Sequence, residues 1–91
     1  MKNEISGEKI RKYLRITEEA LGAVKIKGGS STAKEILDMA TRYFSDAQHY
    51  FKKGDYVTAF ASVNYAHGWL DAGARAGFLE VTGKKELFAM E

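Results

Sequence analysis

The chain has 91 residues, a formal net charge of +2, 45% hydrophobic and 29% charged residues, and no cysteine or proline. This length fits one domain with one modest core. The absence of cysteine excludes a disulfide framework and a cysteine-based metal site. The small net charge argues against nucleic-acid binding, which usually needs a far stronger basic stripe. No apolar run reaches the ~18 residues of a membrane span, and no apolar signal core follows the charged start. We therefore expect a cytoplasmic protein without a membrane partner.

Apolar residues at three- and four-residue steps, together with the lack of proline, predict an all-α chain with short connections. We expect an antiparallel, up-down-up three-helix bundle with a short C-terminal extension, in a single domain over residues 1–91. The helices are predicted at about 7–24, 32–53 and 56–76, followed by a tail over 78–91. Three conformations stay open for the tail: a segment wrapped over the bundle, a short last helix from about Lys84, or a frayed end.

The first helix is predicted to begin at the cap residue Ser6 and to end at the glycine pair Gly28-Gly29. Thr32 and Glu35 have the spacing of a capping box for the second helix, and Ser31 is the rival cap. The predicted apolar stripe of the first helix consists of Ile10, Tyr13, Leu14, Thr17, Ala20, Leu21 and Val24.

The second helix is rich in aromatic rings, and the third is rich in small residues. Glycine inside a helix costs about 1 kcal/mol relative to alanine, so Gly68 and Gly73 need a reason. We expect the rings of the second helix to pack closely against the small residues of the third. Gly54 and Asp55 predict a tight turn between these helices, and Gly77 predicts the end of the third. The buried stripes are predicted to be Ile36, Leu37, Ala40, Tyr43, Phe44, Ala47, Tyr50 and Phe51, and then Ala59, Val63, Ala66, Leu70, Gly73, Ala74 and Gly77.

Short motifs in the second and third helices follow the pattern of one family. They are Tyr43-Phe-Ser-Asp-Ala47, Lys53-Gly-Asp-Tyr56, Ala59-Phe60 and Tyr65-Ala-His-Gly-Trp-Leu-Asp-Ala-Gly73. This half of the chain resembles the archaeal domain-of-unknown-function family 357. The resemblance implies a small three-helix bundle from an archaeal cytoplasm and implies no activity. Residues 47–59 are also similar to the inter-helix turn of tetratricopeptide repeats, but without a recurring period they predict a hairpin and not an array.

Four polar residues of the third helix form a candidate binding site: Asn64, His67, Asp71 and Arg75 share one flank of the helical wheel. His67 and Asp71 are four residues apart, as are Asp71 and Arg75, so each pair can touch. In the functional interpretation His67 is a base or ligand, Asp71 orients it and Arg75 holds an anion. In the structural interpretation, His67 lies at the boundary of the core and hydrogen-bonds the Asp71 carboxylate, and Asp71 and Arg75 form an ion pair along the helix. Both interpretations stay open.

Tyr65 and Trp69 occupy the opposite flank of the third helix and are candidate interface residues, because aromatic side chains are enriched at interface centres. The first helix or the tail could cover them instead. An exposed apolar surface around Trp69 would favour a protein-binding role.

Two weaker patterns involve His49 on the second helix. Asp46 and His49 are possible metal ligands, but two histidines on different faces without cysteine make a poor metal site, so we predict neither metal nor cofactor. The spacing of Arg42 and His49 resembles the Arg–His motif of helical RNases of the higher eukaryote and prokaryote nucleotide-binding class. Both residues fall on the solvent face, which favours a solvated pair.

These patterns favour a non-enzymatic helical interaction or accessory module, binding a protein partner or a second copy through an exposed helix face. The alternative is a nucleotide- or RNA-handling protein that uses Asn64, His67, Asp71 and Arg75. No catalytic residue is predicted, although the sequence leaves an enzymatic role open. Convergence of the four polar residues in one pocket would favour the alternative.

Overall fold

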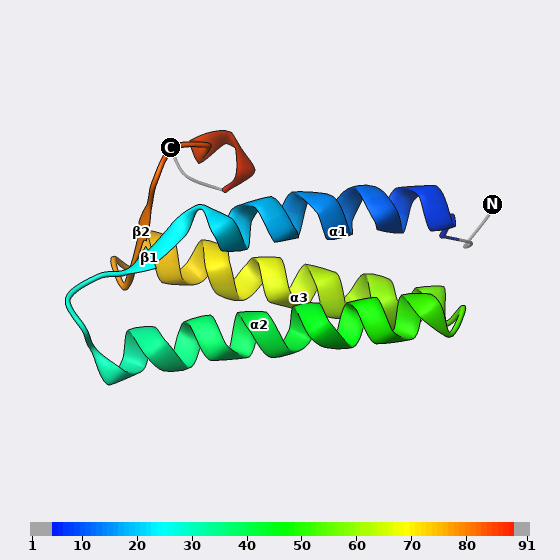
Figure 1. Cartoon of the computed structure of the whole chain (residues 1–91), viewed down its shortest axis with the longest axis horizontal. Coiled ribbons are helices and arrows are strands. Elements are labelled where there is room, and N and C mark those ends of the chain that lie inside the picture. Colours follow the sequence, from blue (N-terminus) through cyan, green and yellow to red (C-terminus); the bar gives the residue numbers. More distant parts are fainter. Residues whose placement is uncertain (1–4, 89–91) are drawn as a thin grey trace.

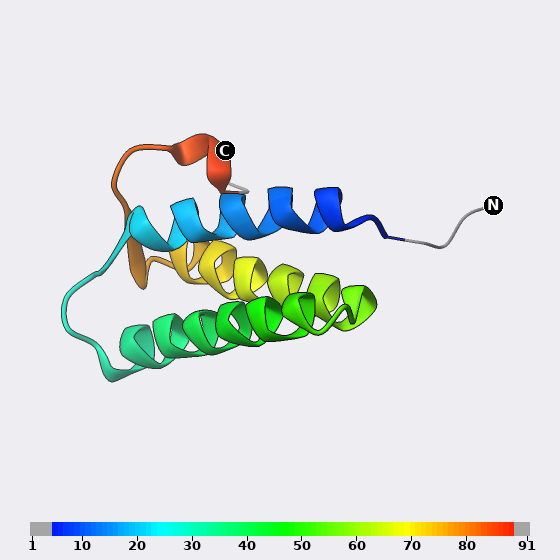
Figure 2. The same ribbon diagram turned by 45° about the vertical axis from the view of Figure 1, so that its right-hand side comes forward.

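A computed structural model describes residues 5–88 and consists mainly of three antiparallel helices. α3 lies between α1 and α2 in both views (Figures 1 and 2). The predicted all-α three-helix bundle is confirmed, with a small two-stranded sheet added at one end. Within residues 5–88, no helix is long and apolar enough to span a bilayer. The elements are α1 (Gly7–Gly22), β1 (Val24–Ile26), α2 (Ser31–Lys52), α3 (Tyr56–Arg75), β2 (Leu79–Val81) and a 3-10 turn, η1 (Lys85–Leu87).

The buried centre of the α2–α3 pair consists of small residues and not of rings. In both helices these residues recur every seven positions, which keeps them on one face. Because helix separation depends on the side chains at the contact, small residues on both sides let the two helices pack closely. The prediction that rings face small residues is therefore wrong. The buried small residues are Ala33, Ala40 and Ala47 in α2, and Ala59, Ala66 and Gly73 in α3.

Most aromatic rings are half-buried along the edges of the helix contacts, whereas Tyr65 of α3 is 62% exposed. Tyr43 of α2 stacks on Tyr65 of α3 with ring centroids 5.0 Å apart. Phe60 of α3 meets Tyr13 of α1 edge to face, at 5.3 Å. Such pairs stabilise beyond the area that they bury, so they fix the helices sideways while the small residues set their separation.

Each helix begins at a polar cap. Ser6 accepts a hydrogen bond from the Lys9 amide, as predicted, and Asp55 accepts one from the Thr58 amide. For α2 the prediction is wrong, because the cap is Ser30, whose hydroxyl accepts from the amides of Thr32 and Ala33. Thr32 therefore lies inside the first turn of α2. Its backbone amide has no acceptor within the helix and donates to Ser30 instead.

The glycines within α3 and at its C-terminal end have different roles. Gly77 has φ +85°; its amide donates to Ala74 and the next amide, of Phe78, donates to Gly73, which is the predicted glycine-dependent helix end. A Cβ on Gly73 would lie 2.8 Å from Leu79 Cδ1 and 2.9 Å from Ile36 Cγ2. A Cβ on Gly68 would meet no atom within 4 Å. Close packing therefore explains Gly73, and the same expectation for Gly68 is wrong.

The first helix ends earlier than predicted, at Gly22, because the following residues form a strand. Val24 of β1 pairs with Val81 of β2 in an antiparallel register. The Gly28-Gly29 pair follows this strand and turns the chain toward α2, with φ of +76° and +73°.

The C-terminal segment is part of the core, so the first of the three alternatives for the tail is the observed one. Leu79 and Phe88 are 2% and 6% exposed, and both join the core cluster with Leu70 of α3. η1 lies against α1, where Lys84 approaches Glu19 at 3.7 Å. The second alternative is also met in part, because the 3-10 helix η1 (Lys85–Leu87) begins where a short last helix was expected. The end of the predicted tail, residues 89–91, lies outside the described residues.

Candidate functional site

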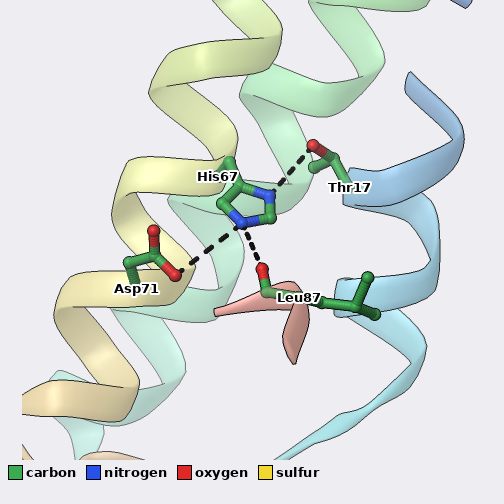
Figure 3. A network of polar contacts seen from close by, with 4 residues as sticks. All are labelled: Thr17, His67, Asp71 and Leu87. Atoms are coloured by element: carbon green, nitrogen blue, oxygen red, sulfur yellow. Dashed lines mark hydrogen bonds and ion pairs between the residues drawn. The ribbon is translucent and has the colours of Figure 1, made fainter. Parts of the chain in front are cut away.

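His67 connects three separate segments of the chain (Figure 3). Its Nε2 lies 2.6 Å from the Leu87 carbonyl oxygen in η1, and its Nδ1 lies 3.2 Å from the Thr17 hydroxyl in α1. A carbonyl only accepts, so Nε2 carries a hydrogen and donates it. In the neutral ring Nδ1 then accepts from Thr17, a tautomer assigned from its partners. Both ring nitrogens are engaged within the fold.

Asp71 lies next to the same edge of the ring, as the four-residue spacing predicted. Its Oδ1 is 3.7 Å from His67 Nε2, and the two side chains are 28% and 21% exposed. The shorter contact of Nε2 is to Leu87, so the predicted histidine–carboxylate pair is the secondary contact (Figure 3). The ring is held by α1 and η1 more than by Asp71.

A small groove of about 220 Å³, lined by both polar and apolar residues, opens between α1 and α3 beside this network. Three of the four predicted binding residues, Asn64, His67 and Asp71, line it. Arg75, the last residue of α3, is exposed and does not. Asn64 donates through Nδ2 to the carbonyl of Phe60, one turn back on its own helix, at 3.0 Å. The complete lining is Tyr13, Ile16, Asn64, His67, Gly68 and Asp71.

The other polar candidates lie apart from this groove, on the exposed side of α2. Arg42 bonds Asp38 at 2.9 Å, one turn earlier on the same helix. The His49 ring packs edge to face on Tyr50, at 5.3 Å. Among residues 5–88 no group of three or more His, Cys, Asp or Glu side chains could hold a metal ion.

A second, larger groove lies on the outward side of α3. Its volume is about 440 Å³, and its lining is almost wholly apolar. Tyr65, which is 62% exposed, and Trp69 form its walls together with Asn64, and Gly68 and Ala72 complete it. On its α2 side Trp69 also borders a groove of about 340 Å³ with Met39. The two predicted interface residues therefore border one open apolar hollow, which we call the apolar groove.

The outward side of α3 carries almost no charge. Among the exposed residues of this helix only the last, Arg75, is charged, and the others are apolar, small or amide side chains. We call this set the outer face of α3: Val57, Ala61, Asn64, Tyr65, Gly68, Ala72 and Arg75.

Some participants were not predicted. Thr17 was placed on the buried stripe of the first helix, and its hydroxyl among apolar neighbours was a signal that a polar partner was needed. The Leu87 carbonyl gave no signal, since its position depends on the path of the tail. Ile16, which is not part of the predicted apolar stripe of the first helix, is half-buried and lines the same groove as His67.

Comparison with known proteins gives a family and no activity. A family model described as "Protein of unknown function (DUF357)" matches residues 12–79. The matched range includes most of α1, which the short motifs had left out. A search of curated proteins and a search of solved structures found no match.

Proposed function

This chain belongs to the family described as protein of unknown function (DUF357), and since that description carries no activity, we propose from the chain's own geometry that it is a helical interaction module. Its binding surface is the outer face of α3. The proposal includes the non-enzymatic, accessory role and the cytoplasmic location that the composition favours, because a chain without cysteine suits a reducing compartment.

One observation supports this proposal above the others: α3 is apolar on the side that faces water. A helix that is apolar all round is normally buried, and contiguous exposed apolar surface is typical of interaction sites. Tyr65 is 62% exposed beside the apolar groove. Aromatic side chains in such positions are enriched where partners bind.

The alternative, a nucleotide- or RNA-handling protein, has one observation in its favour. Asn64, His67 and Asp71 line the same groove. That groove has only about half the volume of the apolar groove. Both nitrogens of His67 already bond Thr17 and Leu87, so the ring has no nitrogen left for a substrate without loss of a fold contact. The interaction module is therefore the better-supported function.

Site-specific photo-cross-linking in cells tests the proposal. A benzophenone amino acid replaces Tyr65 on the outer face of α3 or, as the matched control, Ser45, which is exposed on α2. We expect discrete protein adducts from position 65 that position 45 does not give. Equal or absent adducts at the two positions would contradict an interaction surface on α3.

A further inference from the structure

We propose that the end of the bundle at which α1 begins binds the phosphate backbone of a nucleic-acid duplex, DNA or RNA, without sequence preference. This surface is separate from the outer face of α3, and the inference goes beyond the interaction role proposed above. We call the surface the basic end. It consists of six exposed cations from two segments of the chain: Lys9, Arg11, Lys12 and Arg15 of α1, and Lys52 and Lys53 where α2 ends.

The fold brings these two segments together. The guanidinium carbon of Arg11 lies 5.5 Å from the centre of the Phe51 ring, and Phe51 directly precedes Lys52. A Cβ added at Gly7 would lie 3.1 Å from the hydroxyl oxygen of Tyr56, the first residue of α3. In both views the start of α1 and the turn between α2 and α3 lie at the same end of the bundle (Figures 1 and 2). Cations that are distant in sequence therefore share one surface.

The small net charge of the chain, which argued against nucleic-acid binding, conceals this concentration of cations. Residues 8–15 and 52–55 carry only two carboxylates, Glu8 and Asp55, and Asp55 is engaged as the cap of α3. In the rest of residues 5–88, carboxylates slightly outnumber lysine and arginine. The excess positive charge of the described chain is therefore located at the basic end. Attraction of a polyanion depends on such a local excess and not on net charge alone.

The cations of the basic end are available to a ligand. Within residues 5–88 none of them forms an ion pair, whereas the exposed Arg42 of α2 does. Lys9, like Arg11, lies over an aromatic ring, with Nζ 5.4 Å from the centre of Phe60. A cation held over a ring has less side-chain freedom to lose on binding. Arginine stacked in this way keeps the N–H groups that bind phosphate through paired hydrogen bonds.

The composition of the basic end favours phosphate over a protein or a membrane. A hollow of about 550 Å³ opens among the four cations of α1, and the rest of its lining is Ser6, Glu8 and Tyr13. Protein interfaces have apolar centres depleted of lysine, but the one ring of this hollow is half-buried against Phe60. Cationic helices that bind membranes insert an apolar face. The apolar face of α1 is inside the bundle, where Ile10 is fully buried.

The aromatic rings beside the basic end favour a duplex over a single strand. Proteins that bind single strands offer open ring faces on which bases stack. Here Phe51 stacks on Tyr56, with ring centroids 5.4 Å apart, and Tyr13 meets Phe60 edge to face. Because these half-buried rings already pack against one another, the contacts that the surface offers are to phosphates. Phosphate contacts carry no sequence information.

Fluorescence anisotropy of a short labelled DNA duplex, titrated with the full chain over a salt series, tests the inference. We expect a dissociation constant of about 1–100 µM near 0.15 M salt, the range of non-specific binding. The logarithm of the affinity should fall against the logarithm of salt concentration with a slope of about −3 to −5, since each neutralised phosphate contributes about −0.9. A second DNA sequence and an RNA duplex should bind in the same range.

Two charge-matched variants locate the site. Lys12→Gln with Arg15→Gln removes two cations that lie over no ring and form no ion pair within residues 5–88. We expect at least about tenfold weaker binding at low salt and a slope shallower by about 2, because each phosphate contact contributes about one unit. Lys27→Gln with Lys34→Gln removes the same charge at the opposite end and should change neither quantity. Circular dichroism checks that both variants keep the helical fold.

Two results with the duplex would overturn the inference: no binding at about 50 mM salt, or equal losses from the two variants. Titrations with polyglutamate and with vesicles of mixed phosphatidylcholine and phosphatidylserine supply the other anions. Tighter binding to either of these than to the duplex would reject the nucleic-acid backbone as the ligand. None of these results bears on the proposed interaction function, which is judged by the adducts from position 65.

Discussion

α2 and α3 are helices of 22 and 20 residues that pair through the same seven-residue repeat of small buried residues, but their outer sides differ completely. Every exposed residue of α2 is polar or charged. Most exposed residues of α3 are apolar or small, and only Arg75 is charged. α1 resembles α2, since all its exposed residues except Gly22 are charged.

This difference shows that helix pairing and the polarity of the outer surface are specified by different residues. The inner sides of α2 and α3 specify how the helices pair, and the outer side of α2 shows that a polar surface is compatible with that pairing. The bundle therefore does not require an apolar outer face on α3. That face is better explained by the proposed interaction role than by the fold.

The largest expected effect on stability comes from replacing a glycine on each side of α3 by leucine, at Gly73 on the inner side and at Gly68 on the outer side. Gly73→Leu places a side chain where even a Cβ would lie 2.8 Å from Leu79 and 2.9 Å from Ile36. We expect it to lower the free energy of unfolding by about 3 kcal/mol or more, since overpacking of a tight contact is costly. Gly68→Leu, at an open position, should leave the stability of the monomer unchanged or raise it by up to ~1 kcal/mol. Urea unfolding at low protein concentration measures both. Equal midpoints for the two variants would contradict the assignment of an inner and an outer glycine.

The two histidines give a second comparison between the helices. His67→Ala removes the hydrogen bonds that join α3 to Thr17 and Leu87. It should cost about 2 kcal/mol, because a typical net hydrogen bond contributes about 1 kcal/mol. His49→Ala, on the exposed side of α2, should change stability by less than about 0.5 kcal/mol. Thermal unfolding of both variants distinguishes them. Unchanged stability for His67→Ala would reopen the functional interpretation of this ring.

The smallest effect concerns the starts of the helices, where α2 and α3 should behave alike. Ser30→Ala and Asp55→Ala each remove a side chain that accepts from the first turn, and each should cost about 1 kcal/mol. Thr32→Ala serves as the control for α2 and should cost less than about 0.5 kcal/mol, because Thr32 is not the cap. A larger loss for Thr32→Ala than for Ser30→Ala would restore the capping box that the sequence suggested. Denaturant midpoints of the three variants decide between the two caps.

The helices could be predicted from the sequence because their signals are local. Apolar periodicity marked the buried sides, and Gly54 and Gly77 marked turns whose positive φ the structure shows. The pairing of β1 with β2 could not be predicted in this way. Three-residue strands are too short for a clear alternation, and the partners Val24 and Val81 lie far apart in the chain.

In the candidate site too, contacts set by local helical spacing could be predicted, and contacts set by the path of distant segments could not. The proximity of His67 and Asp71 follows from helical spacing alone, and it is found. The stronger contact of His67, with the Leu87 carbonyl, depends on how the tail folds back. Gly68 and Gly73 had the same local signal of a glycine inside a helix. Only the arrangement of the neighbouring segments shows that one is packed and the other is open.

The pairing of β1 with β2 has a consequence for the order in which the protein folds. α2 and α3 are joined by a short turn, so their contacts can form progressively outward from that turn, whereas Val24 meets Val81 only after most of the chain is in place. Contacts of long sequence separation are slow to form because a large loop must close first. We therefore expect the sheet to be the last element acquired. In native-state hydrogen exchange, the Lys27 and Thr82 amides, which bond Phe78 and Ala23 across this closure, should lose protection before the centre of α3 does.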